Sequence, residues 1–435
     1  MRCCPKIHSI VAGMNILWVS HFVPYPPKGG ALQRSYHLLR ETASRHQVHL
    51  VMIGRRAIPS HPDLLLEAEE HFRGFLASSA SFQPWWGRSA ARWWVLVAGT
   101  GLTPLPFDQT SLHSLAMHAH LKRLSGKASP DVVHLDTIGL WPYARYFASA
   151  PIVLNHHNIE SQLTQRRAAL EPNPLKRAYL GREASKLDRL ERLACVRART
   201  NIVVSELDAA RLRAVAPTAR AWVVDNGVDV GYFRPNPDVR ARPKSLVFAG
   251  GMNWYPNRDA AVYFVNEIWP RLREVSPESS ITFVGQDPAA EVTGSPDPRI
   301  RATGFVDDVR PFLDQAEIYV CPIRNGGGTR LKILDALAMA KPIVATGLAV
   351  EGLDLIDGEH YLRAEGPDEF ATSIRSLQAD PESRNRLSQA GRKLVEDRYS
   401  WTRIGRQLDE AYRFTADQAE AAGGAASPSF PNRTA

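Results

Sequence analysis

The sequence predicts an α/β protein with two Rossmann-like, doubly wound domains that face each other across a cleft. Its 435 residues exceed what one ordinary hydrophobic core supports and suit two domains of about 200 residues each. Apolar runs of strand length alternate with segments that are apolar at helical spacing, as in parallel sheets covered by helices. The alternation occurs twice, on either side of a polar, proline-bearing linker at 236–244.

The first domain is expected to cover residues 14–235, after a disordered extension over 1–13. Its strands are predicted at 15–20, 49–53, 131–135, 152–155 and 201–204, and its main helices at 31–45 and 172–199. The turn-rich segment NGVDVGYFRP then ends the domain at Pro235.

The second domain is expected to cover residues 236–400. Its strands are predicted at 245–249, 281–284, 300–303, 318–321 and 343–345, and its helices at 260–275, 309–316 and 329–340. A last amphipathic helix at 401–416 is expected to pack back on the first domain. Residues 417–435, rich in Ala, Gly, Ser and Pro, are expected to be disordered.

Composition limits the partners and the location. Lys and Arg number 53 against 45 Asp and Glu, and the net charge of +8 favours an anionic partner. No apolar run approaches the roughly 20 residues of a transmembrane helix, and 1–13 lacks the apolar core of a signal peptide. The cysteines Cys3, Cys4, Cys195 and Cys321 form no C-x-x-C pair and predict neither disulfides nor a zinc site. A cytoplasmic location, including the inner face of the membrane, fits best.

The segment 319–346, YVCPIRNGGGTRLKILDALAMAKPIVAT, is the most informative. A buried strand leads into three glycines and then into a helix that carries Arg330, Lys332 and Asp335 in its first turns. Glycines let a phosphate approach the backbone, and the free N–H groups and cations at a helix start attract anions. Asp335 can accept hydrogen bonds from ribose hydroxyls. The segment therefore predicts a nucleotide diphosphate site; the alternative is an ordinary strand–turn–helix connection with surface charges.

This segment resembles the donor-site signature of the GT4 family of retaining glycosyltransferases, which have the GT-B architecture. The segments PPKGGALQRSYHLL, HHNIES, VVDNGVDVGYFRP, FAGGMNWYPNRDA and GFVDDVRPFL resemble further motifs of that family. The resemblance spans the chain from Met14 to about Ala416. In detail the chain is similar to sugar transferases that accompany exosortase-type exopolysaccharide clusters.

The resemblance implies a hexosyltransferase. It would move a sugar from a UDP- or GDP-linked donor to a polysaccharide or lipid-linked precursor, with retention of anomeric configuration. Neither a metal nor another cofactor is expected, and the chain has no D-x-D pair after a strand to chelate a divalent ion.

The resemblance also implies roles for single residues at the donor. Asp335 matches the acid that holds the donor ribose, whereas Gly327 occupies the position of the family's other acid. Backbone N–H groups of Gly327, Gly328 and Thr329 are therefore expected to bind the sugar or the diphosphate. Many relatives place an Arg and a Lys on the diphosphate where this chain has Gly251, Asn253, Asn257 and Arg258. We expect Arg330 and Lys332 to take over that charge.

Further positions follow from the same resemblance. Gly304, Phe305 and Val306 match the loop that reads the base, and Gly30 matches a loop of the first domain that closes over the phosphate. His157 lies just beyond the strand 152–155 and matches the histidine near the reacting sugar. His157 and Asp335 are the predicted catalytic residues, with a structural role for His157 as the alternative.

A cluster of tryptophan and arginine follows the first strands. It contains Trp85, Trp86, Arg88, Arg92, Trp93 and Trp94. Such a cluster suits a membrane interface, where rings sit among headgroups and cations meet anionic lipid. A helical lid packed on the first domain is the alternative. Membrane contact would favour a lipid-linked acceptor.

Other functions stay open at this point. A nucleotide-sugar epimerase or hydrolase could use the same fold, and a non-catalytic nucleotide-sugar-binding protein would explain Gly327. A nucleotide-dependent dehydrogenase is disfavoured because no G-x-G-x-x-G follows the first strand. Nucleic acid is not an expected partner, because the basic residues are scattered over helices rather than interleaved with aromatics.

Overall fold

A computed structural model describes residues 13–54, 64–87, 89–127 and 129–421. The chain divides into two compact units. Unit 1 contains the described residues up to Val203, Ala209–Val224 and the chain from Gly405 onward. Unit 2 contains Val204–Asp208 and Asp225–Ile404.

The boundary between the units lies earlier than the sequence suggested. The predicted boundary follows Pro235, whereas the structure places the segment from Asp225 in unit 2. Backbone bonding explains the difference, because Val228 N donates to Tyr399 O over 2.7 Å. Gly227 also lies against the ring of Trp401, where a Cβ atom would come within 2.7 Å.

Unit 1 is built on a seven-stranded sheet in which all neighbours run parallel. The strand order is β3 (Ser78–Phe82), β2 (Gln47–Ile53), β1 (Asn15–Ser20), β4 (Val132–Leu135), β5 (Ile152–Asn155), β6 (Thr200–Val203) and β7 (Ala221–Val223). The direction of winding reverses between β1 and β4, where Trp18 lies opposite His134. The carboxyl ends of these two strands are the topological switch point, at which ligands bind in such sheets.

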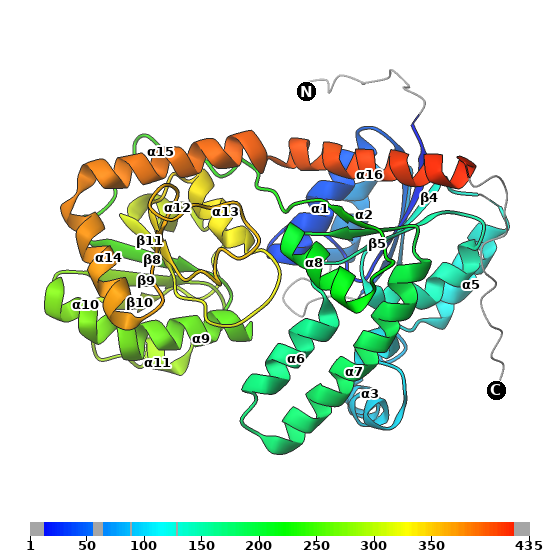
Figure 1. Ribbon diagram of the computed structural model, residues 1–435, viewed down its shortest axis with the longest axis horizontal. Coiled ribbons are helices and arrows are strands. Elements are labelled where there is room, and N and C mark those ends of the chain that lie inside the picture. Colours follow the sequence, from blue (N-terminus) through cyan, green and yellow to red (C-terminus); the bar gives the residue numbers. More distant parts are fainter. Residues whose placement is uncertain (1–12, 55–63, 88, 128, 422–435) are drawn as a thin grey trace. The chain divides into compact units, whose positions relative to one another are not determined.

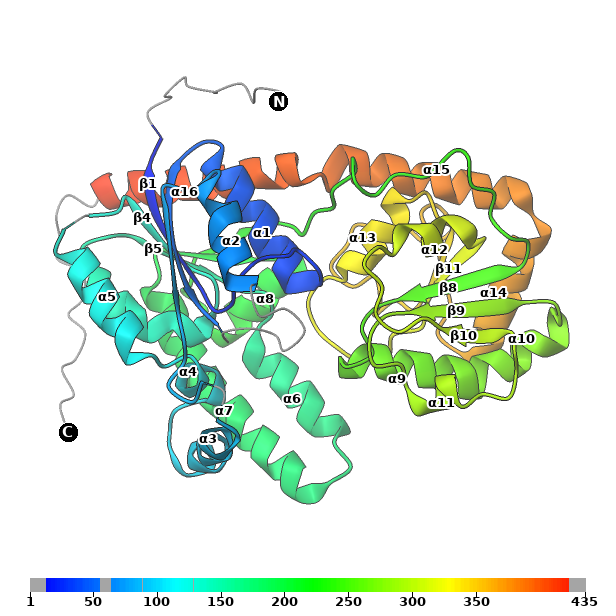
Figure 2. The ribbon, with the colours of Figure 1, turned by 180° about the vertical axis from the view of Figure 1, so that it is seen from behind.

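Helices cover both faces of this sheet (Figures 1 and 2). The helices of this unit are α1 (Gly30–Ala43), α2 (Leu64–Arg73), α3 (Ala90–Leu102), α4 (Phe107–Ser111), α5 (Leu115–Ser125), the 3₁₀ helix η1 (Ile138–Phe147), α6 (Glu160–Leu170), α7 (Pro174–Arg197), α8 (Glu206–Val215) and α16 (Trp401–Ala421), of which α3 and α6 extend away from the sheet. On one face, Leu17 and Val133 share a core with residues of α5, η1, α7 and α8. On the other, the ring of Trp18 stacks on His134 at 3.8 Å, and Tyr412 of α16 bonds to His134 over 2.9 Å.

Unit 2 repeats this architecture with a six-stranded parallel sheet. The strand order is β10 (Ile300–Ala302), β9 (Ser280–Val284), β8 (Ser245–Ala249), β11 (Ile318–Cys321), β12 (Ile343–Ala345) and β13 (Leu362–Arg363). The winding reverses between β8 and β11, which defines the switch point of this unit. The two doubly wound sheets confirm the predicted α/β class.

One predicted helix of unit 2 is interrupted in the structure. The helices of this unit are α9 (Tyr255–Tyr263), the π-helical turn η2 (Phe264–Ile268), α10 (Trp269–Val275), α11 (Ala290–Thr293), α12 (Arg310–Gln315), α13 (Leu331–Ala338), α14 (Pro367–Ala379) and α15 (Pro381–Arg398). The helix predicted at 260–275 thus contains a π turn, in which Trp269 N donates to Phe264 O. Pro270 follows directly and has no N–H to donate, so the regular ladder is interrupted there.

The chain ends also differ in part from the prediction. Helix α16 continues to Ala421, so disorder from residue 417 is wrong for 417–421. Arg199 donates to Gln418 O over 2.9 Å and holds this last turn in place. Residues 1–12, most of the predicted N-terminal extension, and 422–435 lie outside the described residues.

Candidate functional site

The switch point of unit 2 is lined by glycine turns. Gly250 follows β8 with a φ of 155°, and Gly285 follows β9 with a φ of 151°. A Cβ atom on Gly285 would lie 2.3 Å from Gly250 O, so no other residue fits there. Gly304 follows β10 with a φ of 71° and accepts a bond from Gly285 N over 3.2 Å. The turns at the carboxyl ends of these three strands thus contain glycines, which place no side chain over the backbone.

A partly buried cation, the Lys332 ammonium, lies at these turns. Lys332 Nζ donates to Asn257 Oδ1 over 2.5 Å, and Asn257 Nδ2 donates to Gly251 O over 2.8 Å. The Lys332 ammonium also lies 4.6 Å from the ring centre of Phe248. Burial lowers the pKa of Lys332 to about 8. Three residues predicted for the donor, Gly251, Asn257 and Lys332, are therefore in contact.

The glycine loop before α13 departs from the sequence prediction. The helix begins at Leu331 rather than at Thr329, so Arg330 precedes it and Asp335 lies little more than one turn along it. The buried guanidinium of Arg330 donates to Gly328 O over 2.6 Å and lies 3.7 Å from the Glu351 carboxylate. Arg330 therefore holds the loop in shape, instead of projecting from the first turn of the helix.

Thr329 is also held within unit 2. Its hydroxyl accepts a hydrogen bond from Asn226, in the NGVDV segment. Gly326 and Gly328 adopt φ values of 127° and 65°, which favour glycine. The loop Gly326–Thr329 is thus fixed by its backbone conformation and by Asn226.

One carboxylate oxygen of Asp335 is available as a hydrogen-bond acceptor. Its Oδ1 is buried and has no hydrogen-bond partner among the described residues. Burial raises the pKa of Asp335 to about 8, against the opposing charge of Lys332. A buried carboxyl oxygen that lacks donors is suited to a ligand that brings hydroxyl groups to it.

The other predicted donor residues lie in two places. Gly304, Phe305 and Val306 follow β10, at the same edge of the sheet as the glycine turns, and the Phe305 ring is 58% exposed. Gly30 is the first residue of α1 in unit 1, after Gly29 with a φ of 108°. Gly304, Phe305 and Val306 thus lie in unit 2, whereas Gly30 lies in unit 1.

The switch point of unit 1 gathers three side chains that can take part in catalysis. They are His21 after β1, Asp136 after β4 and His157 beyond β5. His157 Nε2 lies 3.4 Å from Asp136 Oδ1, and His21 Nδ1 lies 3.9 Å from Asp136 Oδ2. Asp136 is fully buried and also accepts bonds from Ser35 Oγ over 2.8 Å and from Asn155 Nδ2 over 2.9 Å.

These contacts set the charges of the cluster. Burial alone would raise the pKa of Asp136, but the imidazoles of His157, His134 and His21 hold it well below its usual range. Burial lowers the pKa of His21 to about 3, against the effect of Asp136. The Asp136 carboxylate thus lies close enough to His157 Nε2 to orient that imidazole.

The neighbouring histidine has a different environment. His156 is buried, and its Nε2 lies 3.1 Å from Asn201 Oδ1. The His157 side chain is 13% exposed. Of the two, His157 is the one that a ligand can reach.

Sequence reasoning found His157 but missed Asp136 and His21. Each of the two directly follows a predicted strand, and carboxyl ends of neighbouring strands meet at one edge, which is the signal that could have found them.

The ligand atoms of His21, Asp136 and His157 lie within 4.8 Å of one another and could hold a metal ion. Metal independence stays a prediction. Cys195 and Cys321 are buried free thiols, and Cys3 and Cys4 lie outside the described residues.

Two doubly wound units, one with glycine turns, a cation and an open carboxyl at its switch point, define an α/β protein with the architecture of nucleotide-binding folds. Comparison with known families narrows this class. Residues 28–232 match the family described as Glycosyltransferase Family 4, and residues 243–380 match the family described as Glycosyl transferases group 1. Two consecutive glycosyltransferase domains therefore cover most of the chain, which has the GT-B fold and is a transferase enzyme.

Sequence relatives agree with this assignment. The phosphatidyl-myo-inositol mannosyltransferase of Mycobacterium leprae is 25% identical over 344 residues, which cover 74% of this chain and 84% of the relative. The glycogen synthase of Mycobacterium tuberculosis is 23% identical over 423 residues, which cover 92% of this chain and 94% of the relative.

Solved structures share the fold. Sucrose-phosphate synthase from Thermosynechococcus elongatus has a TM-score of 0.68 at 18% identity, over 94% of this chain and 100% of that chain. Anabaena Alr3699/HepE in complex with UDP and glucose has a TM-score of 0.63 at 14% identity, over 92% of this chain and 100% of that chain.

Proposed function

We propose that this enzyme transfers a hexose-type unit from a UDP- or GDP-linked sugar to a polysaccharide or lipid-linked precursor, with retention of configuration. One observation carries the proposal: bare glycine turns, Lys332 and the open carboxyl of Asp335 occupy the switch point of one unit. Similar proteins support the donor class, since one is named a GDP-mannose-dependent mannosyltransferase and another was solved with UDP-glucose. The likeness to exopolysaccharide-associated transferases supports a role in exopolysaccharide biosynthesis.

Each part of the nucleotide has a suitable partner in unit 2. The glycine turns and the N–H groups of Gly327 and Gly328 would meet the diphosphate, with Lys332 supplying the positive charge. Asp335 would accept hydrogen bonds from the ribose hydroxyls, which favour its ionised form. The loop Gly304–Val306 would contact the base through its backbone. Arg330 would act indirectly, by holding the glycine loop.

Unit 1 would supply the groups that orient the reacting sugar. In retaining transfer without a protein nucleophile, the acceptor attacks on the face that the diphosphate leaves, and the diphosphate takes the acceptor proton. His157 would hydrogen-bond the sugar or an acceptor hydroxyl, and Asp136 would fix its ring and tautomer. Neither a metal nor a cofactor takes part in this scheme.

The location is part of the proposal. Within the part of the chain that the structure describes, no helix is long and apolar enough to cross a membrane. We infer that the enzyme works in the cytoplasm, at the inner face of the membrane, as a peripheral protein. The relatives named for phosphatidyl-myo-inositol support a lipid acceptor.

A thermal-shift screen with UDP, GDP and their sugars tests the donor site. A ligand at a hundred times its Kd stabilises the folded form by about 2.7 kcal/mol, so one of the two diphosphates should raise the melting temperature. Lys332→Met should abolish the rise, whereas Lys393→Met, which removes an exposed lysine of α15, should keep it. No response to any nucleotide would contradict the proposal.

Product analysis then tests the reaction. With a lipid extract as acceptor source, the labelled sugar should move to an extractable glycolipid, and its anomeric configuration should match that of the donor. Release of free sugar at the same rate with and without acceptor would instead identify a hydrolase. Conversion of the donor into its epimer would identify an epimerase.

A further inference from the structure

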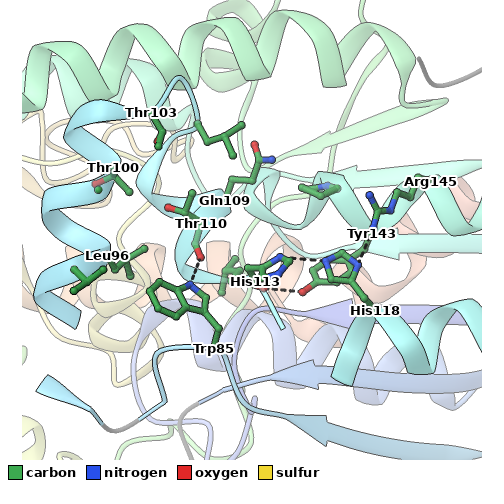
Figure 3. Close-up of a pocket in the computed structure, with 15 residues that line it drawn as sticks. Trp85, Leu96, Thr100, Thr103, Gln109, Thr110, His113, His118, Tyr143 and Arg145 are labelled. Carbon is green, nitrogen blue, oxygen red and sulfur yellow. Dashed lines mark hydrogen bonds between the residues drawn. The ribbon is translucent and has the colours of Figure 1, made fainter. Parts of the chain in front are cut away.

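Unit 1 contains a cavity of about 490 Å³ among α3, α4 and η1, formed entirely within this unit. Figure 3 shows Trp85 and Leu96 toward one end and His118, Tyr143 and Arg145 at the other. Its volume is in the range of pockets that enclose small ligands. None of the lining residues is acidic.

The polar groups of the cavity are mostly used within the protein. Tyr143 donates to Leu112 O over 2.7 Å, and Trp85 Nε1 donates to Thr110 O over 3.2 Å. His118 bonds to Tyr146 through Nδ1 and to His113 through Nε2. A sugar or a nucleotide would find few free partners here, so the lining favours a hydrocarbon ligand.

Arg145 gives the cavity a positive end. It donates to Tyr146 over 2.9 Å, and no carboxylate of the described residues forms an ion pair with it. Burial and Arg145 lower the pKa of His118 to about 4, so the imidazole is neutral at pH near 7 and Arg145 supplies the charge. A ligand with an apolar chain and an anionic head fits this polarity.

Helix α3 extends the apolar surface from the cavity to the outside. Val95, Leu96 and Gly99 line the cavity, while Trp94 is 68% and Leu102 is 87% exposed. Arg92 is the charged residue of this helix. Within the predicted tryptophan cluster, Trp93 packs against Trp86 at 4.9 Å, and Arg88 lies outside the described residues. Trp86 and Trp93 are thus packed within the protein, whereas Trp94 and Leu102 form an exposed apolar surface on α3. Such a surface is typical of contact with lipid.

We propose that this cavity binds the lipid anchor of the acceptor, with the hydrocarbon chain against Leu96 and the phosphate on Arg145. The proposal rests on the proposed function and names the acceptor as a lipid phosphate. Trp94 and Leu102 of α3 lie in the headgroup layer of the membrane from which the anchor is drawn. The sugar acceptor is thereby tethered to unit 1.

Two glycines of α3 give a matched test. A Cβ atom at either Gly99 or Gly101 would meet nothing within 4 Å, so a side chain can leave the backbone at both positions without a clash, and leucine favours the helix. Gly99 lines the cavity, whereas Gly101 does not. Gly99→Leu should weaken binding of dodecyl phosphate, measured by calorimetry below its micelle concentration, at least about tenfold, and Gly101→Leu should not. Equal binding by the wild type and both variants would overturn the proposal.

The charge is tested separately. Arg145→Gln should weaken binding of dodecyl phosphate about tenfold but leave binding of the uncharged dodecyl maltoside unchanged. Arg123→Gln, at the exposed end of α5, is the control and should bind both as the wild type does. Equal losses for both amphiphiles would show that Arg145 shapes the cavity and does not bind a phosphate.

Two further measurements distinguish binding of the lipid anchor from binding of bulk lipid, and test the cavity independently of the donor site. Gly99→Leu should still sediment with phosphatidylglycerol vesicles, because α3 remains exposed; loss of sedimentation would assign the cavity to bulk phospholipid instead. The same variant should keep the thermal response to UDP or GDP. A wild-type protein that binds dodecyl phosphate but no nucleotide would refute the proposed donor chemistry and leave the cavity assignment standing.

Discussion

Replacing Asp335 by asparagine should stabilise the protein at neutral and alkaline pH. In the unfolded chain this carboxyl ionises near its ordinary pKa of 3.8, whereas burial raises its pKa in the folded protein to about 8. Between these values the folded state binds more protons than the unfolded state, so the free energy of unfolding falls as pH rises. The amide of the Asp335→Asn variant does not titrate in this range, so the substitution removes this slope.

The size of the effect follows from the two pKa values. One pKa unit corresponds to about 1.4 kcal/mol, so the full difference sets a ceiling of about 6 kcal/mol at pH near 8. The side chain is partly exposed, and water that reaches it reduces the penalty to about 2 kcal/mol. The gain should fall below about 1 kcal/mol near pH 4 and vanish only below about pH 3, where the wild-type carboxyl is protonated in both states.

Urea denaturation from about pH 4 to about pH 8 measures this difference. Asp238→Asn, at an exposed position of unit 2, is the control and should run parallel to the wild type. Asp335→Asn should also weaken binding of UDP or GDP, because the amide would offer the ribose a weaker acceptor than a carboxylate. Parallel curves for Asp335→Asn and the wild type would refute the reasoning, since they would mean that Asp335 is solvated and ionised when folded.

Three further results are expected. Asp136→Asn should lower the rate of sugar transfer about 100-fold and leave nucleotide binding intact, because His157 loses its orienting carboxylate; a normal rate would contradict that role. Gly285→Ala should lower the free energy of unfolding by about 3 kcal/mol and Gly304→Ala by about 1 kcal/mol, since only the first creates a backbone clash; equal losses would point to φ strain alone. EDTA should leave transfer unchanged, and a loss reversed by added Zn²⁺ or Mg²⁺ would mean that a metal takes part.

Elements buried on both faces were readable from the sequence. The strands Asn15–Ser20, Ile152–Asn155 and Ser245–Ala249 have the predicted bounds, because an unbroken apolar run leaves few alternatives to a central parallel strand. The edge strand Ser78–Phe82 was missed. It is mostly serine and only partly buried, so it is formed by pairing with β2 and has no apolar pattern of its own.

The candidate site was predictable where its residues are neighbours in the chain. The glycine loop and Asp335 lie in one segment, and their spacing is meaningful without a structure. Asp136 and His157 are brought together by the order of the strands, which no local pattern encodes. The first residue of α13 was also missed, because the contact of Arg330 with Glu351 that holds the loop joins residues distant in sequence.

The discontinuous composition of unit 1 constrains how the enzyme can be recombined with its relatives. Tyr412 and Thr415 of α16 are fully buried, and they bond to His134 of β4 and Thr200 of β6, which lie 278 and 215 residues earlier in the chain. In a chimera that exchanges only the residues before Asp225, α16 would pack against the sheet of a different enzyme, whose side chains are not matched to it. An exchange of acceptor specificity therefore has to transfer the residues of unit 1 that precede Asp225 together with Gly405–Ala421.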